Sequence, residues 1–347
     1  MSVVGRVEWV TRYVVIGAGA IGGAIVGLLA DAGTDVLAVA RGAHAASIAE
    51  RGLTVRTPER TFTVRVPSVT DPSKQQLALD DVLVLATKTH QADVALRQWV
   101  DVPVVDGGTT VGTAGELLPM LTALNGVVSE DLALRYFERV VGVCVWMPAA
   151  HIEPGEVIVR GTPIPGTFHV GSVPSDRDES VLLGSIDRDW SAAGMRIVRP
   201  DDVMPWKYRK LVSNIGNAFQ ALVGADGSIG ALVRAAEGEA RAVLDAAGVD
   251  VISDEDEAAE RAASGLRITQ VPGQQGALGG SSWQSMARGT GDIETDYLNG
   301  EIALIARRHG IEAPINAGIA RLARQASAAG QAPGAITAAE LAGLLGL

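Results

Sequence analysis

The sequence predicts an α/β protein in which a doubly wound sheet occupies the N-terminal part and an all-α part follows it. Apolar, strand-like runs alternate with helical patterns over residues 13–198, as in sheets covered by helices on both faces. A glycine-rich turn joins the first strand to the first helix. After Pro200 the strand patterns stop and helical patterns follow one another. We therefore predict two domains, residues 1–200 and residues 201–347.

The glycine-rich turn has the spacing and the context of a dinucleotide-binding motif. An apolar β-type run, residues 13–16, leads into a G-x-G-x-x-G sequence made of Gly17, Ala18, Gly19, Ala20, Ile21 and Gly22. The first glycine allows a tight turn, the second leaves room for a pyrophosphate, and the third lets the helix pack closely on the sheet. A small-residue helix and a second strand, residues 35–40, follow. This context predicts a Rossmann-type site with the cofactor phosphates at the helix N-terminus.

Arg41 follows the second strand, at the position that distinguishes NAD from NADP in this kind of fold. An acidic side chain there would bond both ribose hydroxyls of NAD, whereas a guanidinium pairs with a 2′-phosphate. Arg41 therefore favours NADPH as the cofactor. The alternative is a solvated arginine at the end of a strand.

The other patterns of the first part fit the same sheet. Residues 81–87 form a continuous apolar run, typical of a central parallel strand, and Lys88 to Gln91 follow at the edge where open α/β sheets bind ligands. Residues 100–119 are rich in Gly and Thr and predict a strand followed by a flexible insertion. The remaining predicted elements are helices at 43–51 and 180–193, a hairpin at 53–56 and 61–66, and strands at 121–124, 140–147, 157–160, 167–171 and 195–198.

Composition and charge narrow the classes of function. The net charge of −11 argues against a nucleic-acid partner, because phosphate binding needs a basic face. The one cysteine, Cys144, excludes an intramolecular disulfide and lies in an apolar strand pattern that predicts a buried thiol. No run of 18 apolar residues predicts a membrane-spanning helix, and residues 1–12 lack the features of a targeting segment, so we expect a cytoplasmic protein. The five histidines have no metal-ligand spacing.

Helical patterns cover most of the chain after residue 200. The first carries Lys207, Lys210, Asn214 and Asn217 within one narrow arc beside an apolar face. A solvated stripe is the simpler interpretation, but two asparagines inside a helix lower its propensity, and this favours a functional face. Thr337 begins a capping box for the last helix. The predicted helices are 201–223, 228–248, 254–270, 281–288, 292–309, 314–329 and 337–345.

Two acidic residues, Glu294 and Asp296, lie near the predicted start of a helix. The helix dipole favours carboxylates there, so periodicity alone predicts a capping role for both. His90 lies beside Lys88 at a strand end, where a surface histidine is the simpler interpretation and a residue of a ligand cleft the alternative.

Taken in this order along the chain, the motifs resemble the ketopantoate reductase (2-dehydropantoate 2-reductase) family over about residues 13–322. The motifs that carry the resemblance are Gly17–Gly23, Ala40–Gly42, Lys88 with Gln91, Asn125–Val127, Trp206–Asn214, Ser282, and Glu294–Gly300. The resemblance implies an NADPH-dependent reduction of a 2-keto acid to a 2-hydroxy acid, a small-molecule substrate, and neither a nucleic acid nor a membrane as partner. The oligomeric state stays open, with a homodimer as one alternative.

The resemblance also implies roles for individual residues. Lys210 would be the general acid, since an ammonium near the keto oxygen stabilises the developing charge and donates the proton. Glu294 would orient this lysine or bind the cofactor ribose, and we expect Lys210 to face Glu294 and Ser282 across a cleft between the domains. The substrate side would comprise Asn125, Asn214, Asn217, Asp226 and Ser282, and the cofactor side Gly17 to Gly22, Arg41, Lys88, Gln91, Asn125, Ala150 and Glu294.

Two departures from the family pattern concern the substrate. The second helix asparagine of the family falls on Ala218, and Asn217 comes one place early. A further expected asparagine is Asp226, whose charge would disfavour a carboxylate substrate unless it is protonated or paired. Three hypotheses follow: a reductase of ketopantoate, a paralogue that reduces a different 2-keto acid or related carbonyl, and a non-catalytic NADP(H)-sensing protein.

Overall fold

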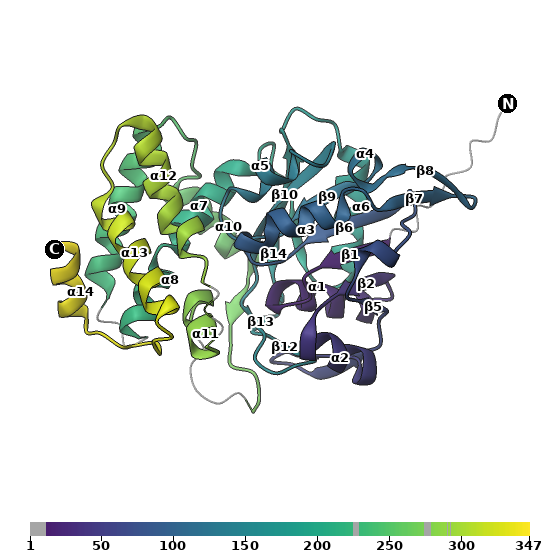
Figure 1. Ribbon diagram of the computed structural model, residues 1–347, viewed down its shortest axis with the longest axis horizontal. Helices are drawn as coiled ribbons and strands as arrows, with labels where there is room; N and C mark the ends of the chain where they lie inside the picture. The colour runs from purple at the N-terminus through teal and green to yellow at the C-terminus, as the bar shows by residue number, and fades with distance from the viewer. Residues whose placement is uncertain (1–11, 225–228, 274–278, 290, 292) are drawn as a thin grey trace.

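An eight-stranded sheet forms the centre of the N-terminal part of the molecule (Figure 1). The computed structural model describes residues 12–347 except 225–228, 274–278, 290 and 292. Neighbouring strands are parallel apart from β10 and β14, which are antiparallel. In spatial order the strands are β15 (Arg196–Val198), β14 (Thr167–Val173), β10 (Arg139–Trp146), β9 (Pro119–Thr122), β6 (Asp81–Leu85), β1 (Arg12–Ile16), β2 (Val36–Val39) and β5 (Ser68–Val69). The predicted doubly wound sheet is confirmed.

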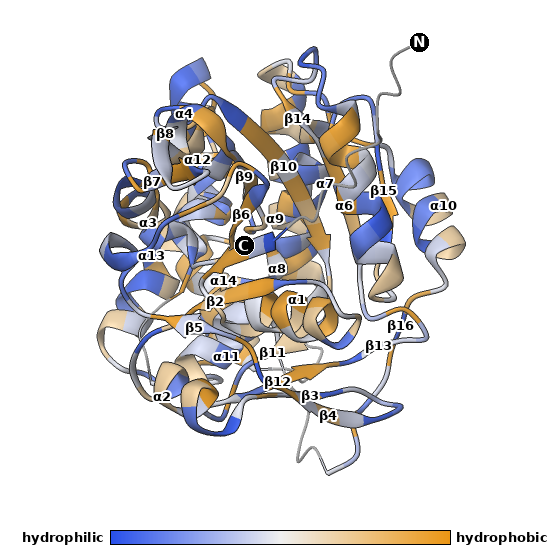
Figure 2. Cartoon of the chain, turned by 90° about the vertical axis from the view of Figure 1, so that its right-hand side faces the viewer, coloured by the Kyte–Doolittle hydropathy of each residue, from blue (hydrophilic) through white to orange (hydrophobic). Residues whose placement is uncertain are grey.

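Helices cover both faces of this sheet, and this explains why its strands read as continuous apolar runs. Along β1, Tyr13 and Val15 pack into the core on one face, while Val14 and Ile16 pack into the core on the other. The central strands are hydrophobic along most of their length (Figure 2). The first face is covered by α1 (Ala20–Asp31) and α6 (Ser180–Ala192), and the second by α3 (Ala92–Trp99), α4 (Ala114–Leu117) and α5 (Ser129–Ala133).

A second, four-stranded sheet packs on the far side of α1 and explains the small residues of that helix. A Cβ added at Gly27 would lie 2.2 Å from Val55 Cγ2, and one added at Gly23 would lie 2.7 Å from Val157 Cγ1. Glycine therefore allows this close approach. The strands are β11 (Ala149–Ala150), β12 (Glu156–Val159), β3 (Leu53–Arg56) and β4 (Thr61–Val64), and α2 (Gly42–Arg51) immediately precedes β3. The predicted hairpin of β3 and β4 is confirmed.

The Gly/Thr-rich stretch is a hairpin rather than a flexible insertion. Strands β7 (Pro103–Asp106) and β8 (Thr109–Thr113) pair antiparallel around Gly107 and Gly108. Both glycines have positive φ, +55° and +84°, as a two-residue hairpin turn requires. Two short 3-10 turns complete this part of the chain, η1 (Pro72–Lys74) and η2 (Thr89–Gln91).

The C-terminal part is mainly helical and has its own apolar core. The single helix predicted over 201–223 is wrong, because the helix breaks at Ile215, whose N–H bonds the carbonyl of Val212 three residues back. Gly216 begins the next helix and adds a residue of low helix propensity at the break. The helices are α7 (Met204–Asn214), α8 (Gly216–Val223), α9 (Gly230–Ala246), α10 (Asp254–Ser264), α11 (Ser281–Ala287), α12 (Asn299–His309), α13 (Pro314–Ala328) and α14 (Ala338–Leu345).

Two further predicted helices are shorter than the pattern suggested. α10 ends at Ser264 because Gly265 adopts the left-handed conformation, φ +65°. The chain then returns to the N-terminal part, where β16 (Arg267–Ile268) pairs with β13 (Gly161–Thr162), so the C-terminal part is not entirely helical. In place of one helix over 292–309, a 3-10 turn η3 (Thr295–Tyr297) precedes α12. Every helix in the described residues is too short or too polar to span a bilayer.

Candidate active site

A cavity of about 580 Å³, here called the cleft, is lined by residues of both parts of the chain. It includes the glycine-rich turn, the residues that follow β6, β9 and β10, and residues of α7, α8 and α11. Parallel strands place their carboxyl ends on one edge of the sheet, and for this reason segments far apart in the sequence meet here. The polar side chains of the lining are Thr87, Lys88, Gln91, Asn125, His151, Arg160, Lys210, Asn214, Asn217, Ser281, Gln284, Arg288 and Glu294.

The glycine-rich turn has the shape that a pyrophosphate needs. Gly17 has φ +99°, and a Cβ added at Gly22 would lie 2.1 Å from the Gly17 carbonyl oxygen. At Gly19 an added Cβ would meet nothing within 4 Å, and Gly19 lines the cleft. A side chain at position 19 would therefore occupy the open space in front of α1. The N-terminus of α1, which has no side-chain cap, faces this space and suits a phosphate group.

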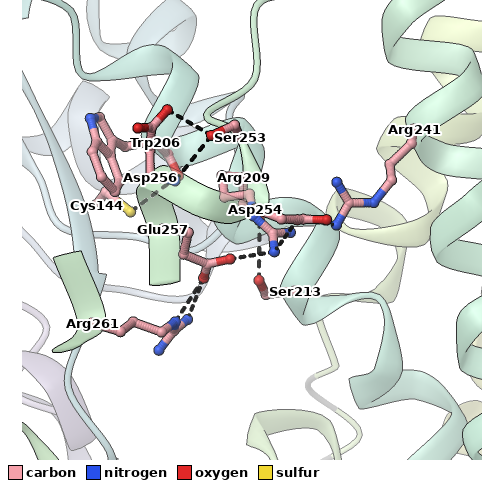
Figure 3. Close-up of polar contacts among 10 residues, drawn as sticks. All are labelled: Cys144, Trp206, Arg209, Ser213, Arg241, Ser253, Asp254, Asp256, Glu257 and Arg261. Atoms are coloured by element: carbon pink, nitrogen blue, oxygen red, sulfur yellow. Dashed lines mark hydrogen bonds and ion pairs between the residues drawn. The ribbon is translucent and has the colours of Figure 1, made fainter. Parts of the chain in front are cut away.

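Helix α7, which carries Lys210, is fixed to α10 by a network of ion pairs. Figure 3 shows Arg209 between Glu257 and Asp254, and Arg241 of α9 also bonds Asp254 at 2.8 Å. Glu257 is buried and accepts from Arg261 as well, at 2.6 Å. Because Asp254 and Glu257 both pair with Arg209, they hold α7 against α10, and Lys210, the residue after Arg209, is held with it.

Lys210 is half-buried and lines the cleft. It makes no hydrogen bond or ion pair with the residues that the structure describes. Burial lowers the pKa of its ammonium group, since a charged group loses hydration there. The buried thiol of Cys144 lies nearby and donates to the Trp206 carbonyl at 3.4 Å, and burial raises its pKa to about 11. The predicted burial of Cys144 is confirmed, and Lys210 lines the cleft without an ion pair among the described residues.

Glu294 lines the same cleft as Lys210, but in the described residues its hydrogen-bond partners are Lys88 and Thr89. The Glu294 carboxylate is buried and accepts hydrogen bonds from Lys88 Nζ at 3.1 Å, from the Thr89 N–H at 2.9 Å and from Thr89 Oγ1 at 2.7 Å. Burial opposes ionisation of Glu294, but Lys88 and the Thr89 donors together lower its pKa. Sequence spacing could not reveal this pairing, because Glu294 precedes η3 and reaches the segment after β6, more than 200 residues earlier.

We expect Glu294→Ala to lower the free energy of unfolding by about 2–3 kcal/mol, because Lys88 and Thr89 lose a charged acceptor. Urea denaturation measures this difference. Since the folded-state pKa of Glu294 is lowered, the contribution should be present above the unfolded pKa, near ~4.3, and be lost as the pH falls further. The control is Asp296→Ala, which removes an exposed pair with Arg324 and should cost under about 1 kcal/mol. Equal effects of both substitutions would contradict this role.

Three predicted substrate residues, all asparagines, meet in the cleft. Asn214 Nδ2 donates to Asn125 Oδ1 at 3.2 Å, which joins α7 to the segment after β9. Asn217 also lines the cleft, and its Nδ2 donates to Ser281 Oγ at 3.5 Å. Ala218, at the position where the family pattern places an asparagine, is buried in the helical core. The break at Ile215 separates the two asparagine positions and contributes to this arrangement.

Ser282 does not line the cleft, and its expected place opposite Lys210 is wrong. Its Oγ is buried without a hydrogen-bond partner in the described residues. The cleft is instead lined by Ser281, Gln284 and Arg288. Positions three and four apart share one face of a helix, whereas adjacent positions point about 100° apart. Ser281, which shares a face of α11 with Gln284 and Arg288, therefore lines the cleft, and Ser282 points about 100° away.

Lys207 is also placed differently from the prediction. The sequence put it on the same arc as Lys210, but its side chain is fully buried and pairs with the buried carboxylate of Glu130. Glu130 also accepts from Thr122 Oγ1 at 2.6 Å and from Ser129 Oγ at 3.1 Å. Helical spacing puts Lys207 on the same face as Lys210 but nearly one turn earlier along α7, where its partner is Glu130 of α5.

Several cofactor-side predictions lie in or near the cleft. Gln91 and Lys88 line it, as do Gly17, Gly19, Ala20 and Ile21. Ala150 is buried and its neighbour Ala149 lines the cleft instead, because successive residues of β11 point to opposite sides. Arg41 is exposed before α2 and donates to Gln98 Oε1 at 2.7 Å. Asp226 lies outside the described residues.

Three titratable cleft residues were missed from the sequence, namely His151, Arg160 and Arg288. Arg288 Nη1 donates to the His151 carbonyl at 3.0 Å and so joins α11 to the sheet side of the cleft. Burial lowers the pKa of His151 to about 4, so its ring is neutral at pH 7. Each of the three follows a short element without a motif, and only the fold brings them together. Within the described residues, no group of three or more His, Cys, Asp and Glu side chains could hold a metal ion.

Comparison with known proteins places these features in a family. The family model described as ketopantoate reductase PanE/ApbA matches residues 13–175, and the model of the C-terminal part of the same family matches residues 202–327. A 2-dehydropantoate 2-reductase of Pyrococcus horikoshii is 27% identical over 315 residues, covering 88% of this chain and 94% of the relative. One of Mesorhizobium japonicum is 30% identical over 262 residues, covering 69% and 77%.

Solved structures have the same fold. A PanE/ApbA family ketopantoate reductase from Ralstonia eutropha superposes with a TM-score of 0.71 at 26% identity, over 92% of this chain and 99% of that one. D-mandelate dehydrogenase in a ternary structure with NADH and anilino(oxo)acetate superposes with a TM-score of 0.73, over the same shares of the two chains. At 19% identity, the second likeness shows the fold alone.

Proposed function

Because the chain belongs to the ketopantoate reductase family, an oxidoreductase family that acts on CH–OH groups, we propose that it reduces a 2-keto acid to a 2-hydroxy acid with NADPH. The observation that carries the proposal is the half-buried Lys210, which lines the same cleft as Asn214 and the glycine-rich turn. An ammonium group that forms no ion pair with the described residues is suited to an anionic substrate and to the negative charge that develops during its reduction.

NADPH, when bound along the glycine-rich turn, supplies the hydride for the keto carbon. As negative charge builds on the keto oxygen, the Lys210 ammonium donates a proton to it and recovers one from solvent afterwards. Asn214 donates one amide hydrogen to Asn125, and its Oδ1 remains to accept from the substrate hydroxyl. Glu294 holds Lys88 and Thr89 in place beside the nicotinamide end of the cleft.

The charge of the cleft also suits an anionic substrate. Glu294 compensates the charge of Lys88, and three more basic residues line the cleft, namely Lys210, Arg160 and Arg288. The carboxylate of a 2-keto acid and the pyrophosphate of the cofactor are the anions that they would attract.

Arg41 is the residue that we propose for the 2′-phosphate of NADPH. Arg41→Ala should raise the dissociation constant of NADPH roughly 10- to 100-fold, since it removes a charge-assisted hydrogen bond. The dissociation constant of NADH should stay unchanged. Fluorescence titration of both cofactors measures this. Arg51→Ala, at the other end of α2, is the matched control. If Arg41→Ala raises the dissociation constants of NADPH and NADH by the same factor, Arg41 does not bind the 2′-phosphate.

Ketopantoate is the first substrate to test, and a different 2-keto acid is the second candidate. Two observations favour the second: Ala218 is buried where the family pattern has an asparagine, and Ser282 is withdrawn from the cleft. Initial rates of NADPH oxidation with ketopantoate, pyruvate and 2-ketoisovalerate separate the candidates. Turnover of none of these acids, together with tight NADPH binding, would contradict the proposed reduction and support a sensor.

A further inference from the structure

His44 joins three separate segments around the glycine-rich turn. It lies in the first turn of α2, and the residue is 9% exposed. Its Nδ1 accepts a hydrogen bond from the Gly155 N–H at 2.9 Å, and its Nε2 lies 2.7 Å from the Ala18 carbonyl oxygen. The ring of His151 packs against it with 4.1 Å between the ring centroids. Figure 1 shows α2 near α1 and β12, the elements that these contacts join.

The two contacts determine the form of the imidazole. A backbone N–H can only donate, so Nδ1 of His44 must be unprotonated. The Ala18 carbonyl can only accept, so Nε2 must carry the hydrogen and donate it. Both bonds therefore need the neutral Nε2–H tautomer. Burial lowers the pKa of His44, which agrees with a neutral ring.

The bond to Ala18 has a consequence for the next residue. The Ala18 carbonyl and the Gly19 N–H belong to one planar trans peptide unit, so they point in opposite directions. His44 draws the carbonyl toward α2. Since Gly19 lines the cleft and precedes α1, its N–H is left to point away from α2, toward the open space at the helix N-terminus.

We infer that His44 is a positioning residue of the cofactor site, which fixes the Ala18–Gly19 peptide so that the Gly19 N–H can donate to the cofactor pyrophosphate. The inference rests on the proposed function only as far as the binding of a nicotinamide dinucleotide. His44 acts through the backbone and touches no reacting atom. Both NADH and NADPH contain the pyrophosphate, so the loss of His44 should lower the affinity for both by the same factor. The loss of Arg41, in contrast, should lower the affinity for NADPH alone.

Two polar variants separate the two bonds of His44. In His44→Asn, the short amide can occupy the place of Nδ1 and accept from Gly155, but it does not reach Ala18. In His44→Gln, the longer amide carries an N–H donor near the place of Nε2. The matched control is Ser47→Ala, because Ser47 Oγ donates to the Pro154 carbonyl at 3.1 Å, so it ties α2 to the same turn without touching Ala18.

The test measures dissociation constants of NADPH and NADH by fluorescence titration, with circular dichroism to check folding. His44→Asn should raise the dissociation constants of both cofactors about tenfold, which corresponds to the loss of one hydrogen bond. For His44→Gln and Ser47→Ala, both constants should stay within about twofold of the wild-type values. At saturating cofactor, kcat should not change. A His44→Asn protein with wild-type affinity overturns the inference, and so does an equal loss in Ser47→Ala.

The remaining outcomes are also decisive. If His44→Asn does not fold, His44→Gln, which has an N–H donor, is compared with His44→Leu, which has none. Equal cofactor affinities of these two variants overturn the inference. If wild type binds both cofactors but reduces no keto acid, the proposed function fails while the binding test of His44 stands. If wild type binds neither cofactor, the inference fails together with the cofactor site.

Discussion

Lys210→Ala should lower kcat for keto-acid reduction roughly a hundredfold or more, because the developing oxyanion loses its proton donor. Initial-rate NADPH oxidation at saturating keto acid measures this. The dissociation constant of NADPH should change little, since the glycine-rich turn and Arg41, not Lys210, are proposed to hold the cofactor. Lys74→Ala, which alters an exposed lysine near α2, is the control and should leave kcat unchanged.

The pH dependence gives the same residue a second test. A general acid works in its protonated form, so kcat should be flat at low pH and fall as the pH rises through the pKa of Lys210. Burial lowers that pKa, so the fall should begin below the range of an ordinary lysine. A profile without this alkaline limb, or a Lys210→Ala variant with wild-type kcat, would remove Lys210 from the mechanism.

Lys207→Met should destabilise the protein by about 3–5 kcal/mol, because it leaves the Glu130 carboxylate buried without a counter-charge. Urea denaturation measures the free energy of unfolding. Thr122 and Ser129 would remain as hydrogen-bond donors to Glu130, but neither carries a charge. The substitution keeps the length of the side chain, so the effect reports the missing charge more than a cavity.

The double variant Lys207→Met/Glu130→Gln tests whether the unpaired charge of Glu130, and not altered packing, causes the loss of stability. The amide oxygen of glutamine can still accept from Thr122, its NH2 group can donate to Ser129 Oγ, and the amide needs no counter-charge, so at least half of the lost stability should return. If the double variant is less stable than Lys207→Met, the buried charge is not the cause. If Lys207→Met unfolds like wild type, the ion pair contributes nothing measurable.

Two other basic residues of α7, Lys207 and Arg209, form ion pairs, whereas Lys210 lines the cleft. Arg209 is held by Glu257 and Asp254, and Lys207 by Glu130. Four lysines occur in the whole sequence, and Lys210 is the one on α7 that lines the cleft. Because both residues precede Lys210 on the same helix, their ion pairs restrict α7, so the Lys210 ammonium can contact a ligand without a rearrangement of the helix.

Local sequence determined the features that depend on a few neighbouring residues. The strand before Gly17, the turn at that glycine and the small-residue helix after it were predictable, because backbone sterics and apolar periodicity act over a few positions. The family motifs also located Lys210 and Asn214 in the cleft, since both lie on one face of one helix.

Tertiary structure alone decided which distant groups meet. Glu294 pairs with Lys88 and not Lys210, and Ser281 rather than Ser282 lines the cleft. His44 reaches Ala18 and Gly155 through contacts that no spacing in the sequence encodes. A rotation of one residue changes the direction of a helical side chain by about 100°, and contacts across more than 100 residues depend on how whole elements pack. For this reason the sequence indicates the kind of chemistry, whereas the packed fold assigns partners to each group.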